Sequence, residues 1–310
     1  MFASGPEKIP TRHNLARVKK RRHFYRVIQM SISSRGIYLL ANDSVLDLAI
    51  ACMSSLRTHN PEIDLCIVPF DSSIRKLQNY SDRFKFCIWN NDHILRDCDQ
   101  ISLKFHDSVM GHYRKLAMWS GPFEEFLYID VDTVVLENIE FVYRYLADYD
   151  FLASHSNMPS IRRFVWKPNM PEVPGLNEEM SSYAANTGFI ASRKGLLAIN
   201  SLSEKLSSAV GLIPFMELES YEQPLLNYLI VTSGLRFGSL WTILREHPEE
   251  DIPVERWGGA DIQGIDSGQV EPRDGVRTLL VHWAGEWRRA RQEGRPIANE
   301  ALWRFYREKE

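Results

Sequence analysis

The segment Phe126-Leu127-Tyr128-Ile129-Asp130-Val131-Asp132-Thr133-Val134-Val135-Leu136 joins two apolar runs through a pair of aspartates. The four apolar residues ahead of Asp130 predict a buried strand. Carboxylates at the end of such a strand need a partner, because burying an unpaired charge is costly. A cation is the simplest partner, and hard oxygen ligands in an open site suit Mg²⁺ or Mn²⁺ bridging to a diphosphate. The alternative is that the two aspartates cap a helix or form a turn.

Two other pairs of aspartates have the same spacing, Asp97 with Asp99 and Asp148 with Asp150. Spacing alone therefore does not identify a metal site. Only the pair at 130 and 132 follows a four-residue apolar run and leads directly into another one, so we expect the cation there.

Short apolar runs alternate with helical patterns along the chain. The runs predict strands at residues 36–41, 64–69, 85–89, 126–129, 150–153 and 278–281. Helices are predicted at residues 42–58, 72–82, 107–120, 194–208 and 220–232. Nearly continuous apolar strands between helices predict an α/β fold with a Rossmann-like, mostly parallel sheet that helices flank on both faces. Such sheets bind ligands beyond the carboxyl ends of their strands.

The composition is that of a globular protein, since 44% of the 310 residues are hydrophobic and 25% are charged. These proportions exclude disordered, collagen-like and disulfide-rich chains. The most apolar early segment, residues 36–56, is interrupted by Asp43 and Asp47, so no membrane-spanning helix is expected. The four cysteines lack metal-binding spacing, which predicts reduced thiols in a cytoplasmic protein.

Residues 1–30 form a basic arm with eight Lys and Arg residues and one Glu, a charge of +7. The remaining residues carry −10, because the whole chain carries −3. We expect the arm to be a solvated, disordered tail or, if translation starts at Met30, not to be native. It is not a secretory signal, because no apolar run follows the basic residues. The alternative is contact with an anionic membrane, which would place the protein at its inner face; no nucleic-acid partner is expected.

His282 also follows an apolar run and lies at the end of a predicted strand. A histidine in that place can be a hydrogen-bonded core residue, and this alternative stays open. The next residues favour a ligand site, because Gly285 permits close backbone approach and Arg288, Arg289 and Arg291 supply fixed positive charge. Two aspartates and one histidine around a cation, with arginines beside them, fit a leaving diphosphate.

Six motifs occur in order between residues 36 and 288. They are Ala41-Asn42-Asp43 after the first strand, Arg114-Lys115-Leu116-Ala117-Met118-Trp119, Tyr128-Ile129-Asp130-Val131-Asp132-Thr133-Val134-Val135-Leu136-Glu137-Asn138-Ile139, Asn186-Thr187-Gly188-Phe189, Glu222-Gln223-Pro224-Leu225-Leu226-Asn227 and His282-Trp283-Ala284-Gly285-Glu286-Trp287-Arg288. Together they resemble the retaining GT-A glycosyltransferases of the glycogenin type and their bacterial lipopolysaccharide galactosyl- and glucosyltransferase relatives, glycosyltransferase family 8. The third motif is the most specific, since it matches the metal-binding signature of that family nearly in full. The resemblance implies a GT-A fold in a single catalytic domain.

The resemblance also implies a role for each matching residue. The metal ligands would be Asp130, Asp132 and His282, holding Mn²⁺ or Mg²⁺. The donor-binding residues would be Asn42, Asp43, Lys115, Asp130, Val131, Thr187, Gly285 and Arg288. The catalytic residues would be Gln223, opposite the leaving group, with Glu222 and Asn186 holding sugar hydroxyls. Residues 31–150 would form the nucleotide-sugar-binding half, residues 151–295 the acceptor-binding half that completes the metal site, and residues 296–310 a C-terminal tail or helix.

The implied reaction moves a hexose from UDP-glucose or UDP-galactose to an acceptor hydroxyl with the anomeric configuration retained. Front-side attack is favoured over a covalent intermediate, because glutamine is a poor nucleophile. The acceptor would be a glycan, a glycolipid, a protein or a small molecule. The chain departs from the family pattern at Arg288, where lysine is usual, and at Glu222, where aspartate is usual.

Two other functions remain as alternatives. A sugar-nucleotide pyrophosphorylase shares the sheet type and the need for metal, but residues 41–44 are not the Gly-rich phosphate loop that it would carry. A non-catalytic carbohydrate-binding module could use some of the eight tryptophans, but it has no need of a metal trio beside a lysine.

Overall fold

The structure is a computed structural model that describes residues 34–168, 170, 176–265 and 268–309. The basic arm of residues 1–30, with its predicted membrane contact and the alternative start at Met30, lies outside the described residues. The predicted acceptor-binding half, residues 151–295, is described except at residues 169, 171–175 and 266–267.

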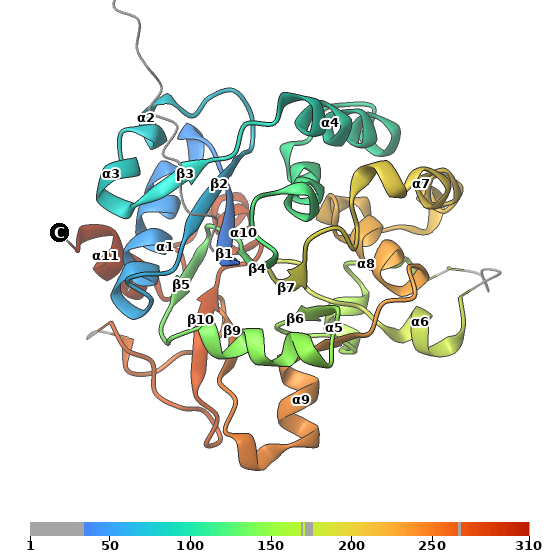
Figure 1. Ribbon diagram of the computed structural model, residues 1–310. Coiled ribbons are helices and arrows are strands. Elements are labelled where there is room, and N and C mark those ends of the chain that lie inside the picture. The colour runs from blue at the N-terminus through green and yellow to red at the C-terminus, as the bar shows by residue number, and fades with distance from the viewer. Residues whose placement is uncertain (1–33, 169, 171–175, 266–267, 310) are drawn as a thin grey trace, which may run out of the picture. The chain divides into compact units, whose positions relative to one another are not determined.

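A seven-stranded sheet runs through the described part of the chain (Figure 1). In spatial order its strands are β3 (Phe86–Ile88), β2 (Leu65–Pro69), β1 (Arg35–Ala41), β4 (Glu125–Ile129), β7 (Phe189–Arg193), β6 (Phe151–Ala153) and β8 (Phe237–Ser239). β7 is antiparallel to its neighbours β4 and β6, whereas all the other neighbouring strands of this sheet are parallel. The predicted α/β fold with a mostly parallel sheet is confirmed.

Helices cover both faces of this sheet. In β1, Tyr38 and Leu40 belong to one hydrophobic cluster, and Ile37 and Leu39 belong to the other, because successive side chains of a strand point to opposite faces. The first cluster includes residues of α4 (Asp92–His106), the 3-10 helix η2 (Gly111–Ser120), α7 (Ser203–Val210) and α8 (Gln223–Thr232). The second includes residues of α1 (Leu46–His59), the 3-10 helix η3 (Glu140–Ala147) and α9 (Leu240–Glu246). Burial on both faces explains why the central strands are apolar throughout.

A smaller sheet brings together two parts of the predicted site. Its strands, in order, are β5 (Thr133–Val135), β10 (Thr278–His282) and β9 (Val254–Trp257). β10 is antiparallel to β5, with His282 opposite Thr133, and the amide nitrogen of Trp283 donates to the carbonyl oxygen of Asp132 over 2.9 Å. Backbone pairing therefore fixes the D-x-D segment beside His282.

The remaining helices are short or lie near the C-terminus. They are α2 (Arg75–Gln78), α3 (Ser81–Phe84), α5 (Pro159–Arg162), α6 (Glu178–Ser182), α10 (Glu286–Glu293), α11 (Glu300–Glu308) and the 3-10 turns η1 (Asp43–Val45), η4 (Ile199–Ser201), η5 (Ile213–Phe215), η6 (Leu218–Ser220) and η7 (Pro248–Glu250). α11 lies beside α1 (Figure 1), where Nη2 of Arg307 donates to Asp47 over 2.6 Å. Most of the C-terminal segment predicted as a tail or helix is thus helical.

Three predicted helices differ from the observed ones. The helix predicted at residues 72–82 is two one-turn helices, α2 and α3. The helix predicted at residues 107–120 is the 3-10 helix η2, which begins at Gly111, because Asp107 adopts a left-handed conformation with a φ of 52° and ends α4. In place of the helix at 194–208, the chain turns at Gly195, whose φ is 83°, forms the 3-10 turn η4 and then begins α7 at Ser203.

Helix α4 was not predicted, although its sequence carries the pattern of an amphipathic helix. Leu95, Cys98, Ile101 and Phe105 are buried at helical spacing. Asp97 and Asp99 lie on the same helix, so this aspartate pair does not follow a strand.

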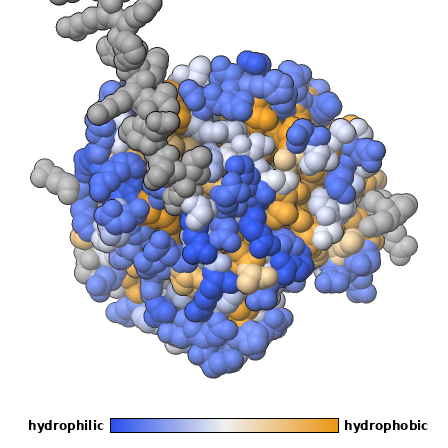
Figure 2. All heavy atoms as spheres, in the orientation of Figure 1, coloured by the Kyte–Doolittle hydropathy of each residue, from blue (hydrophilic) through white to orange (hydrophobic). Residues whose placement is uncertain are grey.

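All four cysteines are free thiols, and three of them are buried, namely Cys52, Cys66 and Cys98. Figure 2 shows hydrophilic residues over most of the face seen in that view, with smaller hydrophobic areas between them. Among the described residues, no helix has the length and apolar character needed to cross a membrane.

Candidate active site

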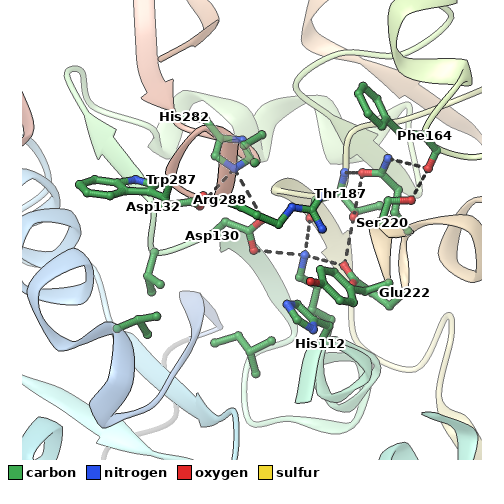
Figure 3. A pocket seen from close by; sticks show the side chains of 18 of the residues that line it. His112, Asp130, Asp132, Phe164, Thr187, Ser220, Glu222, His282, Trp287 and Arg288 are labelled. Carbon is green, nitrogen blue, oxygen red and sulfur yellow. Dashed lines mark hydrogen bonds and ion pairs between the residues drawn. The ribbon is translucent and has the colours of Figure 1, made fainter. Parts of the chain in front are cut away.

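A cavity of about 860 Å³ lies where β1 and β4 end (Figure 3). The residues predicted for the site that line it are Asn42, Lys115, Asp130, Val131, Asp132, Thr187, Glu222, Gln223, His282, Gly285 and Arg288. Asp43 and Asn186 are predicted site residues that do not line it. The cavity thus collects residues from all six motifs at the sheet edge where parallel sheets bind ligands.

Asp130, Asp132 and His282 form a group that could hold a metal ion, with one ligand atom from each within 4.8 Å of the others. Nε2 of His282 lies 3.2 Å from Oδ1 of Asp132 and 3.6 Å from Oδ2 of Asp130. Adjacent ligands of an octahedral Mg²⁺ stand about 3 Å apart, because each lies about 2.1 Å from the ion. Two carboxylates and one imidazole at these separations fit a single Mg²⁺ or Mn²⁺.

The charge around His282 favours a cation. Burial lowers the pKa of His282, but the carboxylates of Asp132 and Glu255 outweigh burial and hold the pKa well above its ordinary value. The imidazole itself is thus a cation among these carboxylates, and a bound metal ion would take over that charge.

Gly188 packs directly against this group. A Cβ atom at position 188 would overlap the ring of His282 and would lie 2.9 Å from Oδ2 of Asp130. The amide nitrogen of Asp130 also donates to the carbonyl oxygen of Gly188 over 2.8 Å. The glycine of the Asn-Thr-Gly motif is therefore explained by the space that His282 and Asp130 occupy.

The two carboxylate oxygens of Asp130 face different partners. Oδ1 accepts hydrogen bonds from the hydroxyl of Tyr128 and from Nζ of Lys115, the latter over 3.1 Å. Oδ2 is left facing His282. Burial raises the pKa of Asp130, but Lys115 and His282 outweigh it, so the pKa lies below its ordinary value and the carboxylate is ionised at neutral pH.

Lys115 joins the two acidic parts of the cavity. Its side chain is 4% exposed, and Nζ lies 2.6 Å from Oε1 of Glu222, 3.1 Å from Oδ1 of Asp130 and 3.3 Å from the carbonyl oxygen of Thr187. Nζ also lies 4.8 Å from the centre of the Tyr128 ring. Burial lowers the pKa of Lys115, but Asp130 and Glu222 raise it above its ordinary value, so Lys115 is charged.

Glu222 and Gln223 stand at the start of α8 and hold the Asn-Thr-Gly segment. Oε1 of Gln223 accepts from the amide nitrogen of Thr187 over 3.1 Å, and the Thr187 hydroxyl donates to Oε1 of Glu222 over 3.2 Å. Nε2 of Gln223 donates to the carbonyl oxygen of Phe164 over 3.2 Å. The amide of Gln223 is therefore fixed at both ends in the cavity wall.

Residues predicted to contact the donor after β1 make local contacts. Nδ2 of Asn42 donates to Oδ2 of Asp71 over 2.7 Å, and Oδ1 of Asn42 caps η1. The carboxylate of Asp43 accepts from the amide nitrogens of Lys76 and Leu77, each over 2.9 Å to Oδ1, and so caps α2. Hydrogen bonding holds the pKa of Asp43 below its ordinary value, although desolvation opposes it. Asn42 lines the cavity, while Asp43 supports its wall.

Positive charge stands at the mouth of the cavity, at the start of α10. Gly285 precedes the helix with a φ of 69°, and Arg288 points into the cavity (Figure 3). Arg289 stacks over Trp257, with Cζ 5.2 Å from the ring centre. Among the described residues, Arg288 has no hydrogen-bond or ion-pair partner. Its guanidinium is free to bind an anion in the cavity.

Glu255 belongs to the site but was missed in the sequence. Its Oε1 lies 3.0 Å from Nδ1 of His282. Burial raises the pKa of Glu255, but His282 outweighs it and holds the pKa below its ordinary value. The surrounding sequence, Val254-Glu255-Arg256-Trp257, lacks the long apolar run that singled out Asp130.

In each of the other two aspartate pairs, one aspartate contacts arginine. Asp99 accepts from Arg114 through both oxygens, over 2.8 and 2.7 Å. Asp150 pairs with Arg193 and Arg236. Sequence context therefore separated the pair in the cavity from two pairs outside it.

Comparisons with known proteins find similar solved structures. Neither models of protein families nor curated protein sequences give a match to this chain. The chain is similar to the bifunctional glycosyltransferase WbbM, with 13% identity and a TM-score of 0.48 over 82% of this chain and 46% of that one. It is similar to the glycosyltransferase GlyE of Streptococcus pneumoniae, with 11% identity and a TM-score of 0.48 over 89% of this chain and 60% of that one.

A third similar structure is the galactosyltransferase LgtC in complex with donor and acceptor sugar analogues. The identity is 11% and the TM-score 0.46, over 81% of this chain and 87% of LgtC. This chain thus spans about half the length of WbbM and 60% of GlyE. All three of these proteins are named as glycosyltransferases.

Proposed function

We propose that this protein is a metal-dependent glycosyltransferase that moves a hexose from a nucleoside diphosphate sugar to an acceptor hydroxyl and retains the anomeric configuration. The observation that carries the proposal is the convergence of Asp130, Asp132 and His282 in one cavity with Arg288, which has no hydrogen-bond or ion-pair partner among the described residues. Three metal-ligand side chains and such a guanidinium suit a diphosphate held through a divalent cation.

The metal ligands would be Asp130 through Oδ2, Asp132 through Oδ1 and His282 through Nε2. Mn²⁺ or Mg²⁺ in this place would offset the negative charge that develops on the leaving diphosphate. Arg288 would add a second cation on the diphosphate, in the place where the family usually has lysine. Its planar guanidinium can bind two phosphate oxygens at once.

Lys115, Glu222 and Gln223 would form the sugar end of the site. In this arrangement Lys115 holds Oε1 of Glu222 in position, so that the other carboxylate oxygen can accept from a sugar hydroxyl. The Gln223 amide, fixed by Thr187 and Phe164, would face the anomeric carbon and stabilise a transition state of oxocarbenium character. Because an amide is a poor nucleophile, we favour front-side attack by the acceptor, with its proton passing to the leaving phosphate.

Uridine is our choice of base, and glucose or galactose our choice of sugar, on the strength of the sequence motifs. Asn42 lines the cavity beside Val45, where the base would lie. The acceptor would be a glycan, a glycolipid, a protein or a small molecule that enters past Arg163 and Phe164.

Product analysis with defined donors tests the proposal. The protein is incubated with Mn²⁺ and UDP-glucose, UDP-galactose or GDP-mannose, with and without a mixture of simple glycosides, and released nucleotide is measured. We expect UDP release that requires Mn²⁺, and NMR of the first product should show the α-anomer. Equal release without metal, a β-linked product, or sugar binding with no turnover of any donor would each contradict part of the proposal, and the last would favour a binding module.

A further inference from the structure

We propose that Glu255 is a positioning residue that orients the imidazole of His282 and thereby sets the affinity of the cavity for a divalent cation. This inference rests on the proposed function, because it assumes that Asp130, Asp132 and His282 hold that cation.

Glu255 and His282 are held together by the backbone of the small sheet. They lie on the neighbouring parallel strands β9 and β10, where Glu255 is opposite Leu280 and Trp257 is opposite His282. Side chains two residues apart on a strand share a face, so Glu255 and His282 are diagonal neighbours on one face. Glu255 is 7% exposed and His282 is 2% exposed. The contact between Glu255 and His282 is therefore buried, and the register of β9 with β10 determines its position.

The contact determines which nitrogen of His282 meets the cavity. Nδ1 lies 3.0 Å from Oε1 of Glu255, while Nε2 faces Asp132 and Asp130. An ionised carboxylate only accepts hydrogen bonds, so Nδ1 carries the proton that it donates to Glu255. The ring is therefore turned so that Nε2 would be the nitrogen that binds a cation in the cavity.

Glu255 is itself fixed by groups from two other segments. Nδ2 of Asn186 donates to Oε1 over 2.9 Å, and the hydroxyl of Ser154 donates to Oε2. Oδ1 of Asn186 in turn accepts from the amide nitrogen of Gly188 over 3.0 Å, and Gly188 packs on His282. Asn186 thus contacts Glu255, which in turn contacts the candidate metal ligand His282. Both carboxylate oxygens of the buried Glu255 have hydrogen-bond partners.

With a cation bound, Glu255 would contact His282 on one side of the ring, and His282 would bind the cation on the other side. In metal sites, a carboxylate on the far nitrogen of a histidine orients the ring and raises its basicity, and its loss typically costs about 10–100-fold in metal affinity. Glu255 also lines a second cavity of about 370 Å³.

The test is the metal affinity of Glu255→Gln in the otherwise complete chain, without nucleotide. Glutamine keeps the size of the side chain but removes the charge. Binding of Co²⁺ and of Mg²⁺ is measured by calorimetry, and the unfolding midpoint of the metal-free protein is recorded. We expect Co²⁺ affinity to fall about 10–100-fold and Mg²⁺ affinity to fall less, because Co²⁺ depends more on the imidazole nitrogen.

Two further variants keep the test decisive. Glu219→Gln removes one charge from the wall of the same cavity without touching His282, and should leave both affinities within about twofold of the wild type. If Glu255→Gln does not fold, Ser154→Ala takes its place, because it frees Oε2 of Glu255 and should weaken Co²⁺ binding in the same direction, by a smaller factor.

The outcomes separate this inference from the proposed function. Unchanged Co²⁺ affinity in Glu255→Gln, while the wild type binds tightly, overturns the inference alone. Equal losses for Co²⁺ and Mg²⁺ with a lowered unfolding midpoint also overturn it, since that pattern marks a merely structural role. A wild type that binds neither ion overturns the metal site of the proposed function and the inference with it.

Discussion

Nε2 of His282 lies 3.2 Å from Oδ1 of Asp132, although the two residues come from opposite halves of the chain. Antiparallel pairing of β10 with β5 creates this approach, because it sets His282 opposite Thr133. The cation site that we propose is thus built on paired backbone rather than on loops. A site on paired strands keeps its geometry before any ligand arrives.

Gly188→Ala should damage the site by overpacking. The added methyl group would overlap the His282 ring and crowd Asp130, and overpacking typically costs about 1–3 kcal/mol. We expect a lower free energy of unfolding in urea and at least tenfold weaker Mn²⁺ binding. Gly211→Ala is the control, since a Cβ there would meet only the carbonyl oxygen of Ser208 at 3.3 Å. Wild-type Mn²⁺ affinity in Gly188→Ala would refute this view of the glycine.

Lys115→Met should destabilise the fold as well as abolish activity. It leaves the buried Glu222 carboxylate without its cation, and breaking such a buried pair costs about 3–5 kcal/mol. The double variant Lys115→Met with Glu222→Gln should recover part of that loss. Urea unfolding of the wild type, both single variants and the double variant measures the coupling. Strictly additive losses would mean that the two residues do not stabilise one another.

Arg288→Ala should weaken the binding of UDP by about 10–100-fold in the presence of Mn²⁺. Charge-assisted hydrogen bonds contribute roughly 1.5–3 kcal/mol, and Arg288 is unpaired among the described residues, so none of its donors is already committed. Arg291→Ala is the matched control, because Arg291 lies on the same helix but does not line the cavity. Calorimetric titration with UDP measures the affinity of each variant. Equal losses of UDP affinity in the two variants would indicate an effect of general surface charge instead.

Asp150→Asn should reduce stability at neutral pH and flatten its dependence on acid pH. Hydrogen bonds from Arg236, opposed by desolvation and supported by Arg193, hold the pKa of Asp150 below its ordinary value of 3.8. A carboxyl with a lowered folded-state pKa contributes its stability above the unfolded pKa and loses it as the pH falls towards the folded one. The difference between wild type and variant should therefore be about 1–3 kcal/mol at pH 7 and shrink below pH ~4.

Urea unfolding at pH 7, 5, 4 and 3 measures this difference. Asp148→Asn serves as the control, because Asp148 is exposed and, among the described residues, its side chain makes no hydrogen bond or ion pair with an arginine. A difference that grows as the pH falls would have the wrong sign for this ion pair.

Much of the site could be predicted because its residues end apolar runs. Asp130 and Asp132 come just after the buried strand β4, and His282 ends the buried strand β10, so these polar residues stand out against their apolar surroundings. The mostly parallel sheet could also be predicted from apolar runs, since strands buried on both faces have continuous apolar sequences. Gly285 and Arg288 could be predicted as site residues because they lie three and six residues after His282 in the same sequence motif.

Contacts between distant segments could not be predicted in the same way. Glu255 lies in a strand of mixed sequence, and only the register of β9 with β10 places it behind His282. Asn186 matched a motif, but its amide is bonded to Glu255 and does not line the cavity. The predicted first and last residues of helices were wrong where a single residue adopts a positive φ, as at Asp107. An aspartate in that conformation has no distinctive sequence pattern.

The most direct test of the account is calorimetric titration of UDP into the wild type and into Asp132→Ala, each with and without Mn²⁺. The Asp132 side chain is 25% exposed, so the alanine variant should stay folded by circular dichroism. We predict that the wild type binds UDP at least tenfold more tightly with Mn²⁺ than without it, and that Asp132→Ala loses this difference. Equal affinity with and without Mn²⁺ in the wild type, or a metal effect that survives in Asp132→Ala, would contradict the central claim.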